Sequence, residues 1–203
     1  MKKLNRLPKQ IGFVPQTKFQ AMNPASVIAR LKAFEGCIDY MYKCTGGEVT
    51  IGIGHALQTA ADAKRLSWQL NGASAEPEQV QSDYTAVAAA PKGQVASAYA
   101  HLTRCRMGAD DVERLVIADV QSFEAQLAAA LPNWSSYPDP AQQALFDMAF
   151  NLGLGGLKKF PTMLHAVNAG DWATAAARCH RMGIGEARNQ ATAALFLQAG
   201  ARA

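Results

Sequence analysis

The sequence predicts an α+β fold in which a small lobe built around a β-hairpin and a larger helical lobe are joined by a long helix. Three observations support this prediction. A glycine-rich segment near the N-terminus alternates as a strand does, most of the later chain has helical periodicity, and one amphipathic stripe runs on from Gly108. A chain of 203 residues is long enough to bury the core of one domain or of two unequal lobes.

The first predicted helix leads to a lone carboxylate, Glu35. Asn23 is expected to cap this helix, Pro24 to occupy its first turn and Gly36 to end it. Apolar side chains recur along it at helical spacing, at Val27, Ile28, Leu31 and Phe34. A carboxylate in the last turn of a helix, just before the chain reverses into strands, lies where a cleft can form. Glu35 is therefore a candidate catalytic acid.

A β-hairpin is predicted after this helix. Gly46 and Gly47 can adopt the positive φ that a tight turn needs. One face of the second strand is apolar and must pack against the core, with Val49, Ile51 and Ile53. The other face is expected to point outward or into a cleft, where two glycines leave room for a ligand, and it carries Glu48, Thr50, Gly52 and Gly54.

The remaining elements are predicted from periodicity and from breaks at proline and glycine. They are a helix over 56–70, one or two helices over 78–106 interrupted at 91–93, the long helix from Gly108, a turn over 134–140, a central helix over 141–152, and helices over 156–169, 171–182 and 186–199. The stripe of the long helix is interrupted by one acid, Asp119. The central helix is apolar on nearly every face, so it should be the buried centre of the larger lobe.

Composition and charge limit the classes of molecule that the protein could bind. A formal net charge of +4 favours a polyanionic partner. The basic residues do not cluster with aromatics, which argues against a nucleic-acid partner. The histidines are scattered and Cys179-His180 is poor metal spacing, so no metal and no cofactor are expected. The cysteines at 37, 44, 105 and 179 have no scaffold spacing and suit a reducing compartment, although one bridge formed after export stays open.

The N-terminal segment 1–22 suggests no chemistry. It is positively charged but lacks the continuous apolar core of a secretory signal, and no stretch of the chain has the length needed to span a bilayer. We expect a tether, or the edge of a larger chain. Synthesis in the cytoplasm without a signal peptide, and no insertion into the membrane, are the corresponding expectations.

Residues around the hairpin carry a resemblance to a known family. The order Glu35-Gly36, Tyr42, Gly47 and Thr50-Ile51-Gly52-Ile53-Gly54-His55 resembles the phage-type lysozyme (endolysin, muramidase) family of glycoside hydrolases. That family spaces a catalytic Glu, an Asp and a Thr as E-x8-D-x5-T. Glu35 and Thr50 match the first and last members, whereas Cys44 stands where the family has its Asp.

Later blocks extend the resemblance. The segment 144–153 with Gly156, Phe160 and Pro161 resembles the family's central helix and the following turn, and 170–176 resembles the next helical pair. The match covers roughly residues 23–67 and 115–199 and implies a lysozyme-like fold. The chain would then consist of the segment 1–22 and a lysozyme-like domain over 23–203, with an insertion over 68–114 that packs or builds the rim of the cleft.

The chemistry implied by the resemblance is hydrolysis of a β-1,4 glycosidic bond between amino sugars. Glu35 would be the general acid, which needs a carboxyl kept protonated by partial burial. Thr50 would hold the attacking water. Three readings of Cys44 stay open: its thiolate acts as base or nucleophile, a nearby carboxylate from Glu48 or Asp39 takes over, or the enzyme is weak or inactive.

The resemblance also suggests supporting residues. Asp147 and Asn151 on the central helix and Arg188 near the last helix are expected to face the cleft and contact substrate, as is Glu48. His55 is expected to be structural and to pair with Asp119 of the long helix.

Two function classes remain. The first is a muramidase that cleaves between N-acetylmuramic acid and N-acetylglucosamine in peptidoglycan, as a phage endolysin or as a secreted antibacterial effector that meets an immunity protein. Such a protein would be made in a bacterial or phage-infected cytoplasm and would act as a monomer in the periplasm or cell wall. The second is a catalytically weak or inactive peptidoglycan-binding module, which the missing Asp keeps open.

Overall fold

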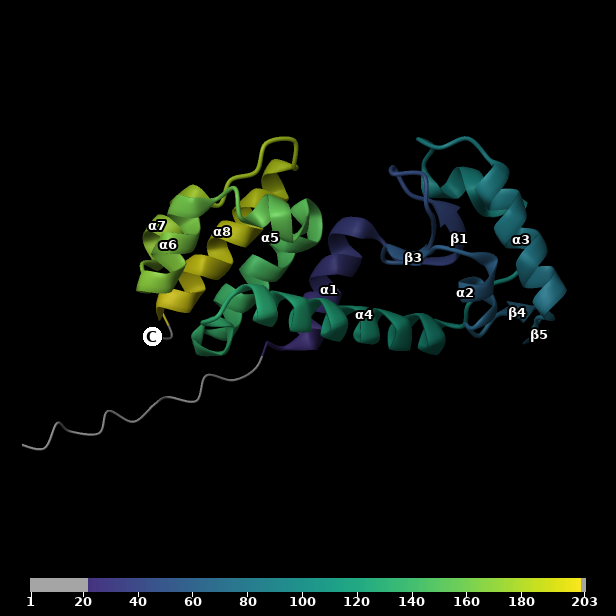
Figure 1. Ribbon diagram of the computed structural model, residues 1–203, viewed down its shortest axis with the longest axis horizontal. Helices are drawn as coiled ribbons and strands as arrows, with labels where there is room; N and C mark the ends of the chain where they lie inside the picture. The colour runs from purple at the N-terminus through teal and green to yellow at the C-terminus, as the bar shows by residue number, and fades with distance from the viewer. Residues whose placement is uncertain (1–21, 202–203) are drawn as a thin grey trace, which may run out of the picture.

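The computed structural model describes residues 22–201, so all but the last residue of the predicted N-terminal segment lies outside the described residues. Two lobes are joined by one long helix (Figure 1). The elements are α1 (Pro24–Glu35), β1 (Ile38–Lys43), β2 (Val49–Gly52), β3 (His55–Leu57), α2 (Ala60–Lys64), β4 (Gln69–Leu70), β5 (Ala73–Ser74), α3 (Pro77–Ala89), the 3₁₀ helix η1 (Ala96–Leu102), α4 (Ala109–Ala130), η2 (Trp134–Ser136), α5 (Asp139–Leu157), α6 (Pro161–Ala169), α7 (Trp172–Arg178) and α8 (Glu186–Ala201). This confirms the predicted α+β, lysozyme-like architecture.

Helix α1 begins and ends where the sequence predicts. The side chain of Asn23 accepts a hydrogen bond from the backbone N–H of Ala25, which satisfies one of the free donors at the helix start. Gly36 ends the helix at φ 75°, in the left-handed region that glycine tolerates best. Val27, Ile28 and Leu31 are buried, and Glu35 is the last helical residue.

The predicted hairpin is present, and its second strand is more buried than expected. Strands β1, β2 and β3 form an antiparallel sheet, with Tyr42 opposite Thr50 and Ile51 opposite His55. All four residues of β2 are buried, including Thr50 at 1% exposure. The expectation that this face points outward or into a cleft holds at Glu48 and Gly54, which are exposed, but it is wrong at Thr50 and Gly52, which are buried. Helix α4 covers the face at Gly52, where a Cβ would lie 3.9 Å from Val112 and Val116.

The helix predicted over 56–70 is wrong. Gly52 and Gly54 both have positive φ, so the chain turns and His55 starts the third strand. The only helix in that range is the short α2, which starts at Thr59 through a capping box with Asp62. The strands β4 and β5 then form a tight hairpin around Asn71 and Gly72, both with positive φ, an Asn-Gly signal for a hairpin turn.

The segment expected to be an insertion belongs to the small lobe. Helix α3 and η1 lie beside the sheet (Figure 1), as the broken helical prediction over 78–106 implied. The buried carboxylate of Asp83 on α3 accepts the backbone N–H groups of Arg104 and Cys105 at 2.8 and 2.7 Å. Burial, with Asp83 adding to it, raises the pKa of the Cys105 thiol to about 11.

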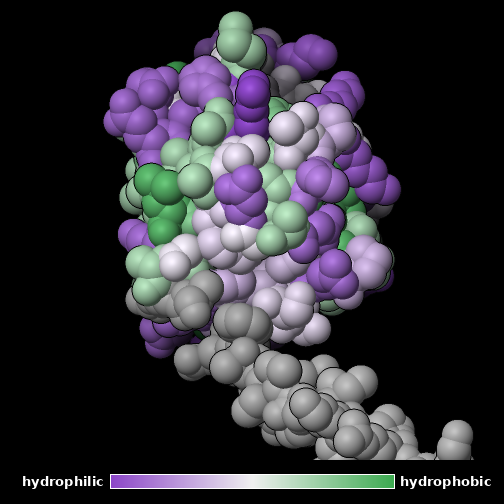
Figure 2. Space-filling model, turned by 90° about the vertical axis from the view of Figure 1, so that its left-hand side faces the viewer, coloured by the Kyte–Doolittle hydropathy of each residue, from purple (hydrophilic) through white to green (hydrophobic). Residues whose placement is uncertain are grey.

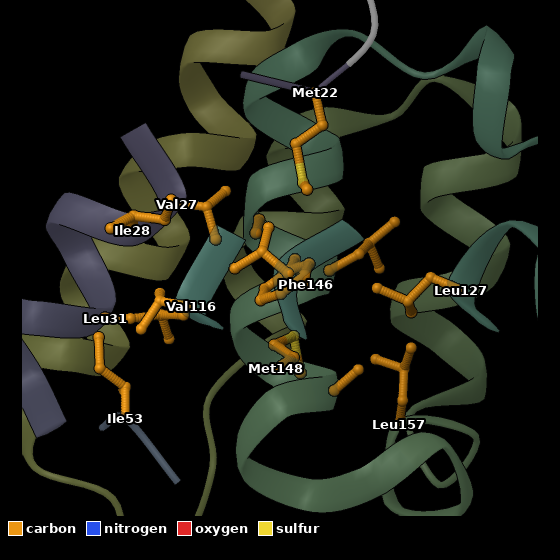
Figure 3. Packing of buried hydrophobic residues seen from close by; sticks show 14 of the residues in the cluster. Met22, Val27, Ile28, Leu31, Ile53, Val116, Leu127, Phe146, Met148 and Leu157 are labelled. Carbon is orange, nitrogen blue, oxygen red and sulfur yellow. The ribbon is translucent and has the colours of Figure 1, made fainter. Parts of the chain in front are cut away.

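In the helical lobe, α1, α4 and α8 all pack against α5. Figure 3 shows Phe146 of α5 between Val27 and Leu31 of α1 and Leu127 of α4. The predicted central helix is buried from Pro140 to Ala149, and it kinks at Gly153, where φ is 70°. The long helix α4 confirms the predicted stripe with Val112, Val116, Val120 and Leu127 buried. This packing fixes α1 against the helical lobe and so places Glu35.

No helix that could span a membrane is found among the described residues, since none of those within residues 22–201 is both long enough and apolar enough to cross a bilayer. The outer end of the helical lobe mixes hydrophilic and hydrophobic residues over the part that the described residues form (Figure 2).

Candidate active site

A cleft of about 600 Å³ lies between the hairpin and the two helices α4 and α5. Glu35 reaches it from the end of α1, and Cys44 and Thr45 reach it from the hairpin turn. Gly54 also lines it, and its missing side chain leaves Phe150 of α5 close to the backbone. The other lining residues are Ile53, His55, Ala56, Asp119, Ser122, Phe123, Gln126 and Asn151. Phe123 and Phe150 meet edge to face at 6.2 Å between ring centroids and form an apolar wall.

Glu35 is held by an arginine from the far end of the chain. Its carboxylate accepts a hydrogen bond from the Arg188 guanidinium at 2.5 Å, and the two side chains are 35% and 9% exposed. The Arg188 guanidinium also lies over the Phe34 ring, 5.2 Å from its centroid. The expected partial burial of Glu35 is present, but its closest charged neighbour is a cation.

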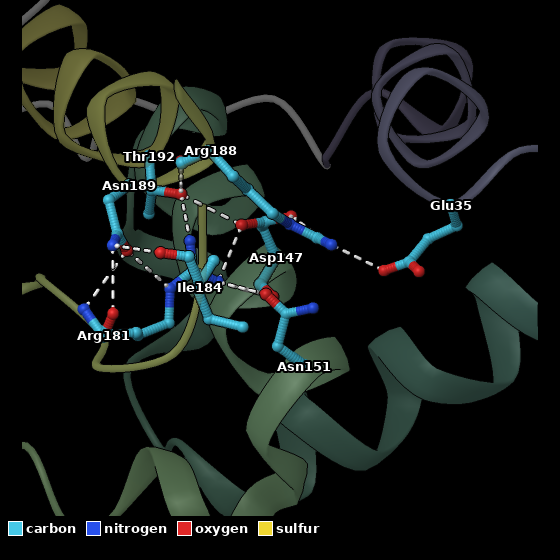
Figure 4. Close-up of polar contacts among 8 residues, drawn as sticks. All are labelled: Glu35, Asp147, Asn151, Arg181, Ile184, Arg188, Asn189 and Thr192. Carbon is cyan, nitrogen blue, oxygen red and sulfur yellow. Dashed lines mark hydrogen bonds and ion pairs between the residues drawn. The ribbon is translucent and has the colours of Figure 1, made fainter. Parts of the chain in front are cut away.

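Asp147 sits behind this pair and is fully buried. One carboxylate oxygen accepts from Arg188 at 3.0 and 2.8 Å, and the other accepts from Thr192 at 2.9 Å and pairs with Arg181 at 2.9 Å. Figure 4 shows Arg188 reaching from this cluster toward Glu35. The prediction that Asp147 faces the open cleft is therefore wrong. Asp147 is in contact with Glu35 only through Arg188, because the guanidinium lies between the two acids.

Arg188 is a fixed cation. Burial opposes its charge, but its hydrogen bonds to Asp147 and Glu35 outweigh burial and raise the pKa of Arg188. A guanidinium buried with a carboxylate on each side holds both in place through its planar set of donors. Its position orients Glu35 toward the cleft.

Cys44, Glu48 and Thr50 form a connected group at the base of the hairpin. The Cys44 backbone N–H and the Thr50 hydroxyl both donate to the Glu48 carbonyl, at 3.0 and 2.9 Å. The Cys44 thiol donates to the Glu48 carboxylate at 3.7 Å. Of these three residues only Cys44 is among the described residues that line the cleft. Thr50 is thus positioned to shape the turn that presents Cys44.

The alternative carboxylates differ in position. Glu48 is exposed and touches the Cys44 thiol, so it can exchange a proton with it. Asp39 is exposed on β1 and its backbone carbonyl accepts from Met107, outside the set of described residues that line the cleft. Geometry therefore favours Glu48 over Asp39 as a partner in the site.

His55 pairs with Asp119 at 2.9 Å, as the resemblance implied. The hydrogen bond to Asp119 outweighs partial burial and raises the pKa of His55. The two side chains are 28% and 40% exposed and both line the cleft, so this pair is only partly buried. His55 starts a strand of its own, because β2 ends at Gly52.

Arg181 is the site residue that sequence reasoning missed. Its fully buried guanidinium contacts Asp147, Asn151 and Thr192, and Asn189 accepts its backbone N–H. Asn151 thereby combines a place in the cleft wall with a contact to the buried cluster. Arg181 lies in a loop between helices, where no periodic pattern marks a buried side chain. Phe123 and Phe150 pack against the core and also line the cleft.

The four cysteines, all within the described residues, are free thiols. Cys105 and Cys179 are buried, Cys37 is exposed and Cys44 is half-buried. The single bridge left open by the sequence is not formed.

Comparison with known proteins gives two matches. The family model for phage lysozyme matches residues 32–195, a range that includes all the cleft-lining residues, from Glu35 to Asn151, and also Arg188. The pre-baseplate central spike protein Gp5 of Enterobacteria phage T4 is 31% identical over 149 residues. The alignment covers 72% of this chain and 23% of Gp5, so the chain spans less than a quarter of that relative's length.

Proposed function

This chain belongs to the phage lysozyme family, and we propose that it is a peptidoglycan hydrolase that cleaves the β-1,4 bond between N-acetylmuramic acid and N-acetylglucosamine. One observation carries the proposal. Glu35, fixed by Arg188, and Cys44 reach one cleft from two different elements, α1 and the hairpin turn. A glycosidase needs two such groups on opposite sides of the scissile bond.

In the proposed reaction Glu35 donates its proton to the glycosidic oxygen while the bond from that oxygen to the anomeric carbon breaks. Water attacks the anomeric carbon from the opposite face and forms the new hydroxyl. Its proton passes to Cys44, which acts as thiolate, and Glu48 is placed to take that proton onward. In this scheme Thr50 is a positioning residue, because its hydroxyl holds the Glu48 carbonyl that also binds the Cys44 N–H.

The proposed setting is bacterial cell-wall lysis, by a phage endolysin or by a secreted antibacterial effector whose partner is an immunity protein. Either would act in the periplasm or at the cell wall as a monomer. The net charge of +4 supports association with an acidic wall.

A second candidate function is binding of peptidoglycan without efficient cleavage. The observation that favours it is Cys44 itself, because a thiol has an ordinary pKa near 8.5 and is less ionised than a carboxylate at neutral pH. A zymogram on purified peptidoglycan separates the two functions.

The test compares the native protein with Glu35→Gln on that zymogram. The variant keeps the shape of the side chain but cannot donate a proton, so we expect clearing to disappear while the circular dichroism spectrum is unchanged. Glu113→Gln is the matched control, since it removes an exposed acid of α4 that does not line the cleft. Clearing by Glu35→Gln at the native rate would sink the assignment. Absence of clearing by the native protein, with retained sedimentation on peptidoglycan, would favour the binding module.

A further inference from the structure

A second polar groove, separate from the cleft, lies beside α1. It has a volume of about 540 Å³ and is bounded by α1, the start of α5 and the second half of α8. Phe34, adjacent to Glu35 in the chain, lines this groove. Its polar lining residues are Asn23, Ser26, Arg30, Asp139, Gln143 and Gln198. Nothing in the proposed reaction uses them.

Arg30 is the unusual residue of this groove. Its Nε is buried, and no described residue accepts a hydrogen bond from it. A buried donor without an acceptor is costly, and a guanidinium has five donors to satisfy. Burial lowers the pKa of Arg30; the charge of Asp147 partly offsets this effect, and the charge of Arg188 adds to it. Arg30 also lines the groove, so the other donors of the same guanidinium can meet an anionic group there.

The groove also carries an acid, Asp139, at the start of α5. The Asp139 Oδ1 accepts from the Asn23 backbone N–H at 2.8 Å, and both of its oxygens accept from the Gln143 side-chain amide at 3.0 Å. A carboxylate has about four acceptor sites, so Asp139 keeps capacity for a further donor. Arg30 on α1 and Asp139 on α5 thus offer one cation and one anion to the same space.

We propose that this groove binds an amino-acid head group, with the ligand carboxylate on Arg30 and the ligand ammonium on Asp139. A planar guanidinium matches a carboxylate in two-pronged geometry, and an ammonium suits a carboxylate acceptor. The surrounding amides and the Ser26 hydroxyl add neutral hydrogen bonds. Two sources carry this chemistry, a free amino acid and the amino-acid end of a cell-wall peptide. The site does not depend on the proposed hydrolysis.

The test uses three small molecules with related carbon chains. Diaminopimelate carries a head group at each end, pimelate lacks both ammonium groups, and 1,5-diaminopentane lacks both carboxylates. Binding is followed by calorimetry and by the NMR signal of the Arg30 Nε–H, with the Glu35→Gln protein so that the result is independent of lysis. We expect diaminopimelate to bind and the other two to bind at least about tenfold more weakly, as loss of a charge-assisted hydrogen bond implies.

Variants locate the site. Arg30→Gln should weaken diaminopimelate binding by about tenfold or more, Arg30→Lys should have an intermediate effect, and Asp139→Asn should remove the preference over pimelate. Lys32→Gln is the matched control: it removes one cation from the same helix at a position outside the groove, and it should leave binding unchanged. Circular dichroism checks that each variant is folded.

Equal binding of the three molecules, no binding of diaminopimelate, or unchanged binding in folded Arg30→Gln would each overturn the proposal. The wall tripeptide of alanine, γ-linked glutamate and diaminopimelate distinguishes the sources. Binding as tight as that of free diaminopimelate assigns the groove to cell-wall peptides, and exclusion of the tripeptide assigns it to free amino acids.

Discussion

Cys44 is where the chain differs chemically from its family. It lines the cleft, and its thiol contacts the Glu48 carboxylate at 3.7 Å. A thiolate at this place can accept a proton from water, and a carboxylate there can do the same. The neighbouring Glu48 gives the site a second acceptor, so the loss of the family's Asp need not remove the base.

Substitution at Cys44 separates these roles. We expect Cys44→Ala to lose most lytic activity and Cys44→Asp to keep a substantial part, because a carboxylate can activate the same water. The measurement is the initial rate of turbidity loss of cell walls as a function of pH.

A test of Cys44 by alkylation has to be made in the Cys37→Ala variant, because Cys37 is also exposed and would be modified as well. Partial burial, with Lys32 opposing it, raises the pKa of Cys37, but its exposure leaves it accessible. In Cys37→Ala, modification of Cys44 should silence lysis. Full activity of Cys44→Ala would exclude a role for this side chain and move the search to Glu48.

His55 gives a pH-dependent contribution to stability. Its pKa is raised in the folded state by Asp119, so the stabilisation is fully present below the ordinary value near 6.5 and is lost as pH rises through the raised value. The side chains are 28% and 40% exposed, so the effect should be modest, under about 1 kcal/mol. Melting temperatures of native protein and His55→Asn should differ most near pH 6 and converge near pH 9. A difference that grows with pH would contradict this.

At the scale of elements, Asp83 ties α3 to the segment that leads into α4. Its carboxylate is 5% exposed and accepts two backbone N–H groups, those of Arg104 and Cys105. The next residue, Arg106, bonds to Gln69 of β4, so the same segment also anchors the second hairpin. One buried acid therefore holds together much of the segment that looked like an insertion.

Removing this carboxylate should destabilise the small lobe. Asp83→Ala leaves two buried donors unsatisfied and should lower the free energy of unfolding by about 2–3 kcal/mol in urea titrations. Asp83→Asn keeps an acceptor oxygen and should cost clearly less. Equal losses in the two variants would show that the charge, and not the pair of hydrogen bonds, is what matters.

At the scale of the whole molecule, net charge should control association with the wall. The formal charge is +4, and raising the salt concentration from about 0.1 to about 1 M shortens the Debye length from about 10 to about 3 Å. Sedimentation of Glu35→Gln protein on peptidoglycan should therefore weaken with salt. Binding that is insensitive to salt would assign recognition to the neutral sugar contacts of the cleft.

The sequence alone determined the elements whose signals are local. The Asn23 cap, the Gly36 stop, the Gly46-Gly47 turn and the stripe of α4 each depend on residues within a few positions of one another. The same is true of Glu35 at the helix end. The family match around Glu35 and Thr50 came from spacing within one short stretch.

Tertiary structure decided which side chains contact one another in and behind the cleft. Arg188 meets Glu35 across 153 positions of sequence and Asp147 across 41, and Arg181 is buried from within a loop. The burial of Thr50, the third strand at His55 and the withdrawal of Asp147 from the cleft depend on which element covers which face. Periodicity indicates whether a side chain is buried or exposed on its own element. Which partner it contacts depends on packing between elements far apart in the chain. A charge that loses its water in such packing needs an opposite charge beside it, and the local sequence does not specify that partner.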